Sequence, residues 1–358
     1  MRILDRYLLA EFAAPFAFAV GAFTLILTSG VLFELADLLL VKRVAAGTVG
    51  SLLFYRLPAV VALTLPIGVL FGVMLSVGRF ARENELAAMR SAGRSFTRSV
   101  APLLILALLL SSLTYLLNEK VVPATNHAYQ TMVREIVLED PAAPVDENVF
   151  FRAGEDRYLY VGRVDRAAHQ VWNVLVYQLR PQGFPVLTSA PRGTYREGEW
   201  RLFDGVTREL DERGFVTRET AFAEMVYRLP SVDRYLLANQ KTPEEMSRSE
   251  LAETISLFAQ AGVDLRELRV EYAMKLSLPF AGLVLALFGA PLSAMGRRPG
   301  QRASSAAALA VLFGYYVVTS LSRSLGINGV LPATLAAWLA NGLFAGLGAW
   351  LVWRAERP

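Results

Sequence analysis

Few residues in this sequence could do chemistry on their own. The chain has no cysteine, which excludes disulfides and thiolate metal ligands, and its two histidines, His127 and His169, lie far apart. We expect both histidines at the surface rather than in a metal or catalytic site. The phosphate-binding pattern G-x-x-x-x-G-K-[ST] and the zinc pattern H-E-x-x-H are both absent. The sequence therefore predicts no catalytic residues, no metal and no cofactor of its own.

The most specific polar segment of the chain follows the second uncharged stretch. Residues 82–92 predict a short helix with an apolar side, flanking acidic residues and a glycine stop, formed by Leu86, Met89, Glu83, Glu85 and Gly93. Such a helix could lie on a lipid surface. An apolar ridge flanked by two glutamates suits a cleft in a protein partner better than it suits anionic headgroups. The segment is therefore interpreted as a docking helix.

Uncharged stretches make up much of the remaining sequence: Phe12–Phe33, Leu57–Gly78, Ser99–Asn118, Leu276–Gly296, Ala303–Ser322 and Ser324–Trp353, in which Leu331–Trp353 is the expected span. Each is long enough to cross about 30 Å of hydrocarbon as a helix. The sequence predicts an α-helical polytopic membrane protein with six transmembrane helices. Its expected parts are residues 1–118 with helices one to three, an inserted domain at 119–275, and residues 276–358 with helices four to six.

Orientation follows from the positive charges in the short connections. With the amino terminus inside, twelve arginines fall on the cytoplasmic side, and four lysines and arginines fall in the opposite short loops. Because positive residues are retained in the cytoplasm, both termini are expected there and the large insertion outside. The first stretch is too long for a typical signal-peptide core, so we expect it to remain a span. The same arginines account for the net charge of +4 without a nucleic-acid partner.

The six cores contain no Asp, Glu, Lys, Arg or His, which disfavours proton or sodium coupling. Small residues recur at helix-packing spacing, and we expect them to serve packing within one subunit more than a dimer seam: Gly68, Gly72 and Ser76; Gly282, Ala286 and Ala290; Gly342 and Gly346. Prolines could kink the spans at positions 66, 279 and 291.

The insertion predicts a β domain, because nine short apolar segments alternate with turn residues: Asn148–Arg152, Arg157–Val164, Gln170–Leu179, Phe184–Ala190, Gly193–Arg196, Trp200–Phe203, Val206–Leu210, Val216–Phe222 and Glu224–Leu229. Such spacing favours an antiparallel sandwich or open barrel. Both faces of Gln170–Leu179 are apolar, so it is either a central strand packed on both sides or part of an apolar groove. After the sheet, Thr242-Pro243-Glu244-Glu245 predicts a capping box, and a helix running to Gly262.

Three segments together resemble one known family. The run Glu83–Gly93 looks like the coupling-helix signature S-E-L-x-x-M-x-A-x-G of the LptF/LptG permeases, which extract lipopolysaccharide from the bacterial inner membrane. The opening Leu4-Asp5-Arg6-Tyr7 is similar to that family, with a lean toward its LptG half, and so is Arg269–Ser293. Asn84 replaces the commoner serine, and Arg90 and Ser91 also depart from the pattern. These departures leave the docking role intact and its affinity open.

The resemblance implies an assembly and a mechanism. It implies a periplasmic β-jellyroll, a second LptF/LptG-type permease subunit (a paralogue or a copy of this chain), periplasmic jellyroll bridge proteins and a cytoplasmic ABC ATPase dimer that binds the ATP. Glu85 matches the ATPase-contacting glutamate of the family. The chain would then be a transport permease rather than an enzyme, located in the inner membrane, with lipopolysaccharide or a related glycolipid as its substrate.

The resemblance also draws attention to basic residues near the outer end of the first span. Lys42 and Arg43, with Arg56 across the loop, resemble the residues that hold lipid phosphates in family members. An ordinary interfacial anchor that snorkels explains the pair equally well. Glu34 and Asp37 would partly offset a phosphate site.

Two alternatives remain open from the sequence. An ABC-type export permease for another lipid or amphiphile, such as one of the cell-division or macrolide type, would usually have four spans with the domain after the first. A membrane-embedded lipid-modifying enzyme would need clustered polar catalytic groups near an interface, and no Ser/His/Asp constellation is visible.

Overall fold

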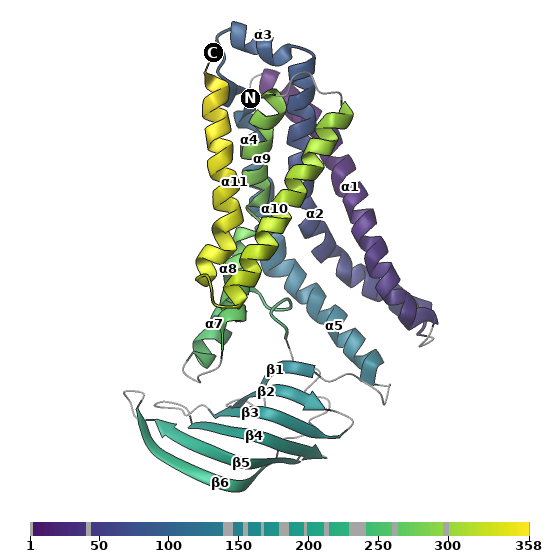
Figure 1. The fold of residues 1–358 in the computed structure, drawn as a ribbon. Helices are drawn as coiled ribbons and strands as arrows, with labels where there is room; N and C mark the ends of the chain where they lie inside the picture. Colours follow the sequence, from purple (N-terminus) through teal and green to yellow (C-terminus); the bar gives the residue numbers. More distant parts are fainter. Residues whose placement is uncertain are drawn as a thin grey trace. The chain divides into compact units, whose positions relative to one another are not determined.

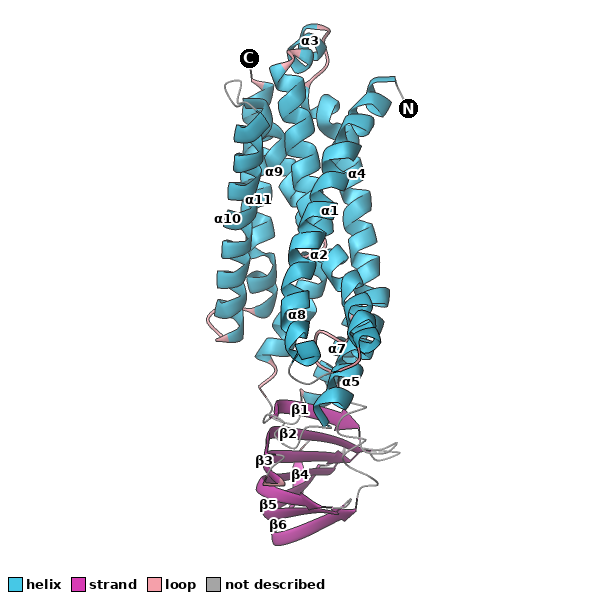
Figure 2. Ribbon diagram, turned by 90° about the vertical axis from the view of Figure 1, so that its right-hand side faces the viewer, coloured by secondary structure: helices cyan, strands magenta, loops and turns pink. Residues whose placement is uncertain are grey.

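The computed structural model describes residues 3–40, 44–138, 146–152, 157–165, 168–178, 186–196, 199–210, 215–228, 241–259, 264–295 and 301–357. The chain divides into two compact units. Met1–Asn126 and Glu245–Pro358 form a helical unit, and His127–Glu244 form a unit built around a sheet. Figure 2 colours the two kinds of element. The sequence predicted domain limits at 118/119 and 275/276, and the two compact units meet at 126/127 and 244/245.

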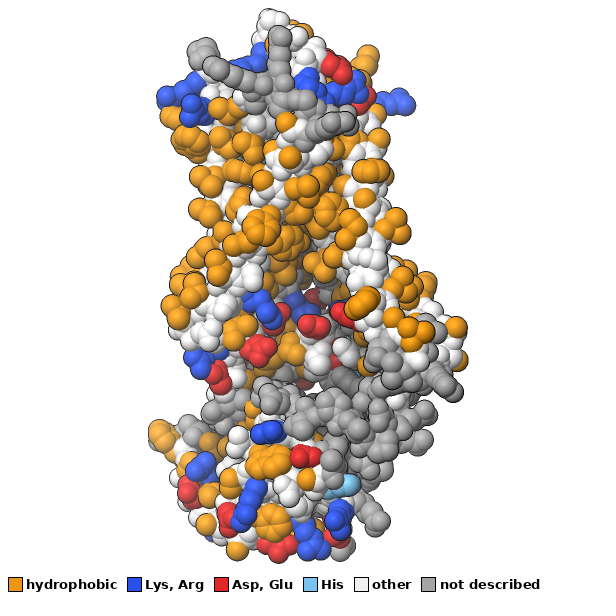
Figure 3. All heavy atoms as spheres, turned by 45° about the vertical axis from the view of Figure 1, so that its right-hand side comes forward, with side chains coloured by type: hydrophobic (Ala, Val, Ile, Leu, Met, Phe, Trp, Pro, Cys, Tyr) orange, Lys and Arg blue, Asp and Glu red, His pale blue; other side chains and the backbone are white. Residues whose placement is uncertain are grey.

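The helices are long and follow the predicted stretches. Their bounds are α1 Ile3–Leu40, α2 Ala46–Arg82, α3 Glu85–Ser91, α4 Phe96–Leu116, a π-helical turn η1 Leu117–Val121, α5 Val122–Leu138, α7 Arg248–Phe258, α8 Arg266–Ser277, α9 Ala281–Met295, α10 Gln301–Ile327 and α11 Ala333–Glu356. Among the described residues, five helices are long and apolar enough to cross a membrane, or six if the bent pair α8–α9 counts as one span. Apolar side chains cover the middle of the helical unit, and charges gather toward its ends (Figure 3).

Helix α2 is the centre of the helical unit, in contact with α1, α4, α9 and α10 (Figure 1). Its glycines let α1 approach closely. A Cβ on Gly72 would lie 2.4 Å from the ring of Phe12, and a Cβ on Gly68 would lie 2.4 Å from Val20. Packing within one subunit is therefore confirmed for this pair. Gly342 has open space around its Cα, so it serves no such contact within the described part of the chain.

Of the three prolines expected to bend spans, Pro279 lies at a break. Helices α8 and α9 meet at an angle of 54° around the turn at Leu278–Phe280. Helices α2 and α9 run on through Pro66 and Pro291. A proline lacks the backbone N–H and clashes with the preceding turn, which fits the break at Pro279, whereas the neighbouring helices accommodate the other two prolines.

The predicted capping box lies five residues too early. Residues 243–245 form a turn, and the capping box joins Ser247 and Glu250 at the start of α7. Glu119, on the π-helical turn, accepts the backbone N–H of Arg248 at 2.9 Å. The first turn of α7 thus receives acceptors from two side chains, which suits the positive end of a helix. A pattern of residue types could not distinguish the two candidate boxes.

The described strands form one antiparallel sheet in which each strand pairs with the next along the chain. The strands are β1 Asp146–Arg152, β2 Arg157–Asp165, β3 Gln170–Gln178, β4 Val186–Arg196, β5 Glu199–Leu210 and β6 Val216–Arg228. Nine short strands were expected, and that number is wrong for the described residues because three pairs of segments join into β4, β5 and β6. The β class itself is confirmed, and β3 lies inside the sheet as a central strand.

The sequence predicted a break within each of β4, β5 and β6, and in the structure these three positions lie on a single line across the sheet. In register, Gly162 lies opposite Asn173, Asn173 opposite Pro191, and Pro191 opposite Asp204, yet none of these pairs belongs to the ladder that continues on both sides. Asn173 and Asp204 have φ angles of 53° and 54°, and a Cβ on Gly162 would lie 2.9 Å from that of Asn173. Strands β2 to β5 therefore each carry an irregular residue at the same level, with the same pairing register on both sides, as aligned bulges would give. We name this row the bend line.

The bend line lets both halves of each strand contribute to one core. Buried residues lie three positions apart across it, as in Val171 and Val174 of β3 or Val161 and Val164 of β2, where a regular strand would give an even spacing. The core includes Trp200 and Leu202 from the other half of the sheet. A strongly bent sheet around one core is consistent with the expected jellyroll-like domain.

The contact between α1 and α2 gives a direct test of the packing. Gly72→Ala should lower the thermal unfolding midpoint, because overpacking a tight contact typically costs about 1–3 kcal/mol. Gly342→Ala is the matched control, since it gains the same helix propensity, up to about 1 kcal/mol, without a neighbour to displace. Unfolding followed in detergent should place the first variant below the second. Equal midpoints would contradict the packing described.

Candidate functional site at the α2–α3 turn

Helix α3 lies across one end of the helical unit, where the sequence predicted a docking helix (Figure 1). Two left-handed residues set its ends. Asn84 has φ 59°, which turns the chain sharply out of α2. Gly93 has φ 81°, and the bonds from Gly93 N to Arg90 O and from Arg94 N to Met89 O close a Schellman motif. Asparagine tolerates the left-handed region, so Asn84 suits this turn. Gly93 ends the helix as predicted.

The apolar side of α3 faces this chain rather than a partner. Leu86 and Met89 are each 8% exposed and belong to the core that holds Leu8, Phe80 and Phe96. The expectation that they fill a cleft in another protein is therefore corrected. Burial of each side chain stabilises the contact between α3 and the long helices by roughly 1.5–3 kcal/mol. Helical periodicity identified an apolar side but could not say whose surface covers it.

Glu85 is held inside the chain by residues that sequence analysis did not select. Its Oε1 accepts the hydroxyl of Tyr7 at 3.0 Å, and Nη2 of Arg79 lies 4.0 Å away. Arg79 also donates to the hydroxyl of Tyr7 at 3.2 Å and pairs with Glu11. The side chain of Glu85 is 28% exposed. The cluster joins α1, α2 and α3 through one guanidinium group.

Glu83 lies beside this cluster and faces outward. Arg79 Nε donates to it at 3.0 Å, and this hydrogen bond holds the pKa of the Glu83 carboxyl below its ordinary value. The side chain is half exposed, so solvent screens the pair and its contribution to stability is small. The outward surface of α3 consists of Ala87, Ala88, Arg90 and Ser91. That surface, with Glu83, is what α3 offers to another molecule.

The opening residues of the chain are tied to the same end of the unit. Asp5 accepts a hydrogen bond from Arg94 Nη2 at 3.0 Å, just after the α3 stop. At the other end of the chain, Glu356 accepts from the backbone N–H of Thr97 at 2.6 Å, in the first turn of α4. The Leu4-Asp5-Arg6-Tyr7 motif therefore has two structural roles here, through Asp5 and Tyr7. The spacing Tyr7–Glu11 and Arg79–Glu83, both i and i+4 on a helix, was the available signal.

The proposed phosphate contacts are described in part. Lys42 and Arg43 lie outside the described residues. Arg56, on α2, donates through Nη1 to Asn126 Oδ1 of α5 at 3.4 Å. Arg56 is therefore engaged in a contact between two helices.

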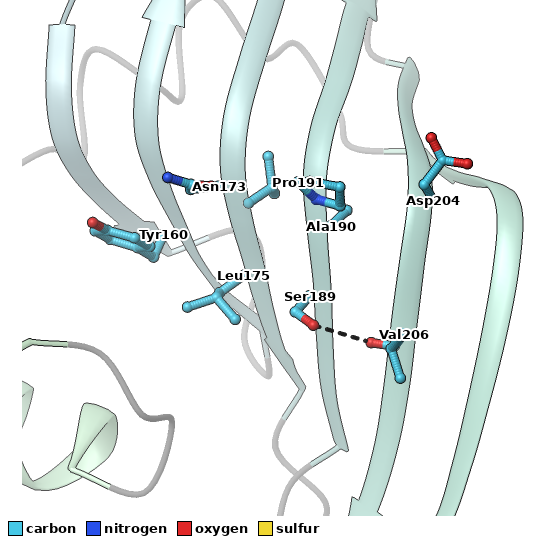
Figure 4. Close-up of a pocket in the computed structure, with 9 residues that line it drawn as sticks. Tyr160, Asn173, Leu175, Ser189, Ala190, Pro191, Asp204 and Val206 are labelled. Atoms are coloured by element: carbon cyan, nitrogen blue, oxygen red, sulfur yellow. Dashed lines mark hydrogen bonds between the residues drawn. The ribbon is translucent and has the colours of Figure 1, made fainter.

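The sheet carries a hollow of about 380 Å³ along the bend line (Figure 4). Tyr160, Leu175 and Val206 line it, together with polar side chains from Asn173 and Asp204. Leu175 lies on the face of β3 opposite the buried residues Val174 and Val176. The second apolar face of β3 thus lines a hollow of mixed polarity.

The histidines take no part in a cluster of metal ligands. In the part of the chain that the structure describes, no three His, Cys, Asp or Glu side chains are grouped so that they could hold an ion. His169 sits at the turn between β2 and β3 with its ring 5.4 Å from that of Tyr195.

Long apolar helices before and after an inserted antiparallel sheet in the sequence, with a short helix between α2 and α4, fit a polytopic membrane protein with an inserted β domain. Comparison with known proteins agrees. Residues 6–354 match the family described as lipopolysaccharide export system permease LptF/LptG. The chain belongs to that family.

Individual relatives carry the name of the same family, at low sequence identity. The chain is 22% identical over 309 residues to the lipopolysaccharide export system permease protein LptF of Escherichia coli K12, of Escherichia coli O157:H7 and of Shigella flexneri. The match covers 85% of this chain and 82% of each relative. These relatives carry the LptF name, whereas the opening residues leaned toward LptG.

Tyr7→Phe tests the cluster around Arg79. Losing the hydroxyl that donates to Glu85 should lower the thermal unfolding midpoint, since a hydrogen bond to a charged group contributes about 1.5–3 kcal/mol. Tyr55→Phe on α2 is the control, because it makes the same atomic change away from the cluster. A midpoint for Tyr7→Phe equal to that of Tyr55→Phe would count against the cluster as an anchor.

Proposed function

We propose that this chain is a permease subunit of an ATP-driven transporter that extracts lipopolysaccharide, or a related glycolipid, from the bacterial inner membrane. A separate ABC ATPase dimer in the cytoplasm binds the ATP, and a second LptF/LptG-type subunit completes the membrane part. Periplasmic jellyroll proteins receive the lipid. The names of the relatives support the lipid class. The distribution of positive charge supports cytoplasmic termini and a periplasmic sheet unit.

The attachment of α3 is the observation that carries this proposal. One side of the helix is fixed to the long helices by Leu86 and Met89, and the other side presents Ala87, Ala88 and Arg90 outward. A partner that pushes on the outward side must move the long helices, because sliding α3 would expose buried apolar surface. The helix therefore acts as a lever rather than as a loose tether.

The cluster around Arg79 extends this lever to α1. Tyr7 and Glu11 come from α1, Arg79 from α2 and Glu85 from α3, so a displacement of α3 is passed to both long helices. Helix α1 presents large apolar side chains outward, among them Phe18, Leu25 and Phe33. Moving α1 relative to α2 would change the apolar wall that lipid meets.

The energy for the step comes from ATP bound by the partner. Exposing acyl chains to water costs about 0.8 kcal/mol per CH₂, so a lipid with many chains needs an enclosed apolar route and an external source of work. Phosphates on the lipid would be met by basic residues near the outer ends of the first two spans, for which Lys42, Arg43 and Arg56 remain the candidates.

Topology can be tested with single cysteines, since the chain has none of its own. Thr220→Cys on β6 and Ser91→Cys on α3 are both at exposed positions. A membrane-impermeant maleimide added to spheroplasts should label the first and reach the second after the inner membrane is permeabilised. Labelling of Ser91→Cys in sealed spheroplasts would overturn the proposed orientation.

Coupling can be separated from assembly with three variants. Ala87→Trp should abolish co-purification of the ATPase, because it adds bulk to the outward side of α3. Tyr7→Phe and Glu85→Ala should retain the ATPase but release less lipid per ATP hydrolysed in proteoliposomes. The lost hydrogen bond, about 1.5–3 kcal/mol, corresponds to roughly a ten- to hundredfold change in the equilibrium between chains in which α3 is bonded to α1 and chains in which it is not.

Glu83→Ala is the control for coupling, because it removes a half-exposed carboxylate that bonds Arg79 without bonding α1, so lipid release per ATP should stay near the wild-type value whatever its effect on docking. Thr220→Trp is the control for added bulk. Co-purification of the ATPase with Ala87→Trp would remove α3 as the docking element. Normal lipid release with both Tyr7→Phe and Glu85→Ala would remove the lever mechanism.

A further inference from the structure

The break between α8 and α9 leaves backbone groups without their helical partners. Helix α8 ends at Ser277, α9 begins at Ala281, and the two helices meet at 54°. The two helices together pass as a candidate membrane span. Inside hydrocarbon, an unpaired C=O or N–H has no water to bond, so a neighbouring helix must supply a partner.

The carbonyl side of the break is met by an amide from α11. Asn341 Nδ2 donates to the backbone oxygen of Ser277 at 2.7 Å. Asn341 is 3% exposed and Ser277 is 1% exposed. A buried amide is costly unless it is bonded, so this pair accounts for an asparagine in the middle of an apolar stretch of α11.

A tyrosine from α10 fixes the orientation of that amide. The hydroxyl of Tyr315 donates to Asn341 Oδ1 at 2.9 Å, and Tyr315 is 2% exposed. The Ser277 carbonyl can only accept, so the atom of Asn341 that faces it must be the amino nitrogen. The oxygen of Asn341 is then left to accept from Tyr315. The three groups form one chain of hydrogen bonds from α10 through α11 to α8.

The amide side of the break is met by a different helix. Ser111, on α4, accepts the backbone N–H of Leu283 at 3.1 Å, in the first turn of α9. Its hydroxyl lies 3.2 Å from where a Cβ on Gly282 would be, so the glycine lets the two helices come close. Helix α9 is thus held by α4, and α8 is held by α11.

We propose that Asn341 and Tyr315 are positioning residues that hold the bend between α8 and α9. The hydrogen bonds from Tyr315 to Asn341 and from Asn341 to the Ser277 oxygen form a latch, and the bend straightens when this latch opens. The latch consists of side-chain hydrogen bonds, so it can open without unfolding either helix. Helix α8 follows α7, the helix that Glu119 caps, and the latch would therefore set the direction of α7 and α8 relative to α9 within the helical unit. The proposal concerns the conformations of this chain and goes beyond the proposed function.

Two spin labels can measure the bend directly. Glu267 on α8 and Met295 on α9 are exposed, and both can be changed to cysteine in a chain that has none. At 1.5 Å per residue, the two positions are about 42 Å apart along a straight helix and about 38 Å apart when it is bent by this angle. Double electron–electron resonance on the full chain in nanodiscs resolves such a difference.

Asn341→Leu keeps the volume of the side chain and removes its donor. We expect its distance distribution to shift toward the longer value or to broaden, while Tyr315→Phe gives a smaller change in the same direction. Asn328→Leu is the matched control, because Asn328 Nδ2 also donates to a backbone oxygen, that of Ser324 at 2.8 Å, but at an exposed site away from the break.

The result that overturns the proposal is a wild-type distance distribution in a folded Asn341→Leu chain. Should Asn341→Leu fail to fold, Tyr315→Phe decides in its place, and a wild-type distribution there would overturn the proposal. The measurement needs neither ATPase nor lipid. Its failure would therefore leave the proposed transport function untouched, and failure of the transport function would leave the latch standing.

Discussion

Hydrocarbon offers no partner to a backbone N–H or C=O, and this constraint governs how the helical unit departs from regular helices. Where α8 gives way to α9, Asn341 of α11 supplies the missing donor and Ser111 of α4 supplies the missing acceptor. Where α4 becomes a π-helical turn, Glu119 projects from it to bond the first turn of α7. Each interruption in a helix is thus also a point of attachment between helices. These irregular places therefore add to the regular packing that joins the helices.

Charge is distributed by the same constraint. The cores of the spans keep neutral groups such as the Asn341 amide and the Ser111 hydroxyl, whereas Arg79 and its acidic partners gather at the end where α3 lies. There the guanidinium joins helices that are far apart in sequence, because one fork can bond several acceptors at once. Neutral hydrogen bonds therefore join helices within the apolar part of the unit, and ion pairs connect that part to α3, the proposed docking element.

The sequence predicted these features unevenly. Apolar runs located the long helices because hydropathy is a local property, and Gly93 located the end of α3 because a positive φ favours glycine. The contacts of Leu86 and Met89 could not be predicted, since periodicity identifies an apolar side but not its partner. The contact between Tyr7 and Arg79 was missed because it joins positions 72 residues apart. The joined strands β4, β5 and β6 were missed because turn residues also occur at bulges.

The bend line has a consequence for how the sheet unit can change in evolution. Because the irregular residues Gly162, Asn173, Pro191 and Asp204 lie level with one another, the ladder keeps its register on both sides of the line. Deleting one residue at this level from a single strand would reverse the faces of everything beyond it, turning Trp200 and Leu202 out of the core if β5 were the strand affected. Insertions and deletions should therefore accumulate in the loops between strands, while the strand lengths across the line are inherited as a set.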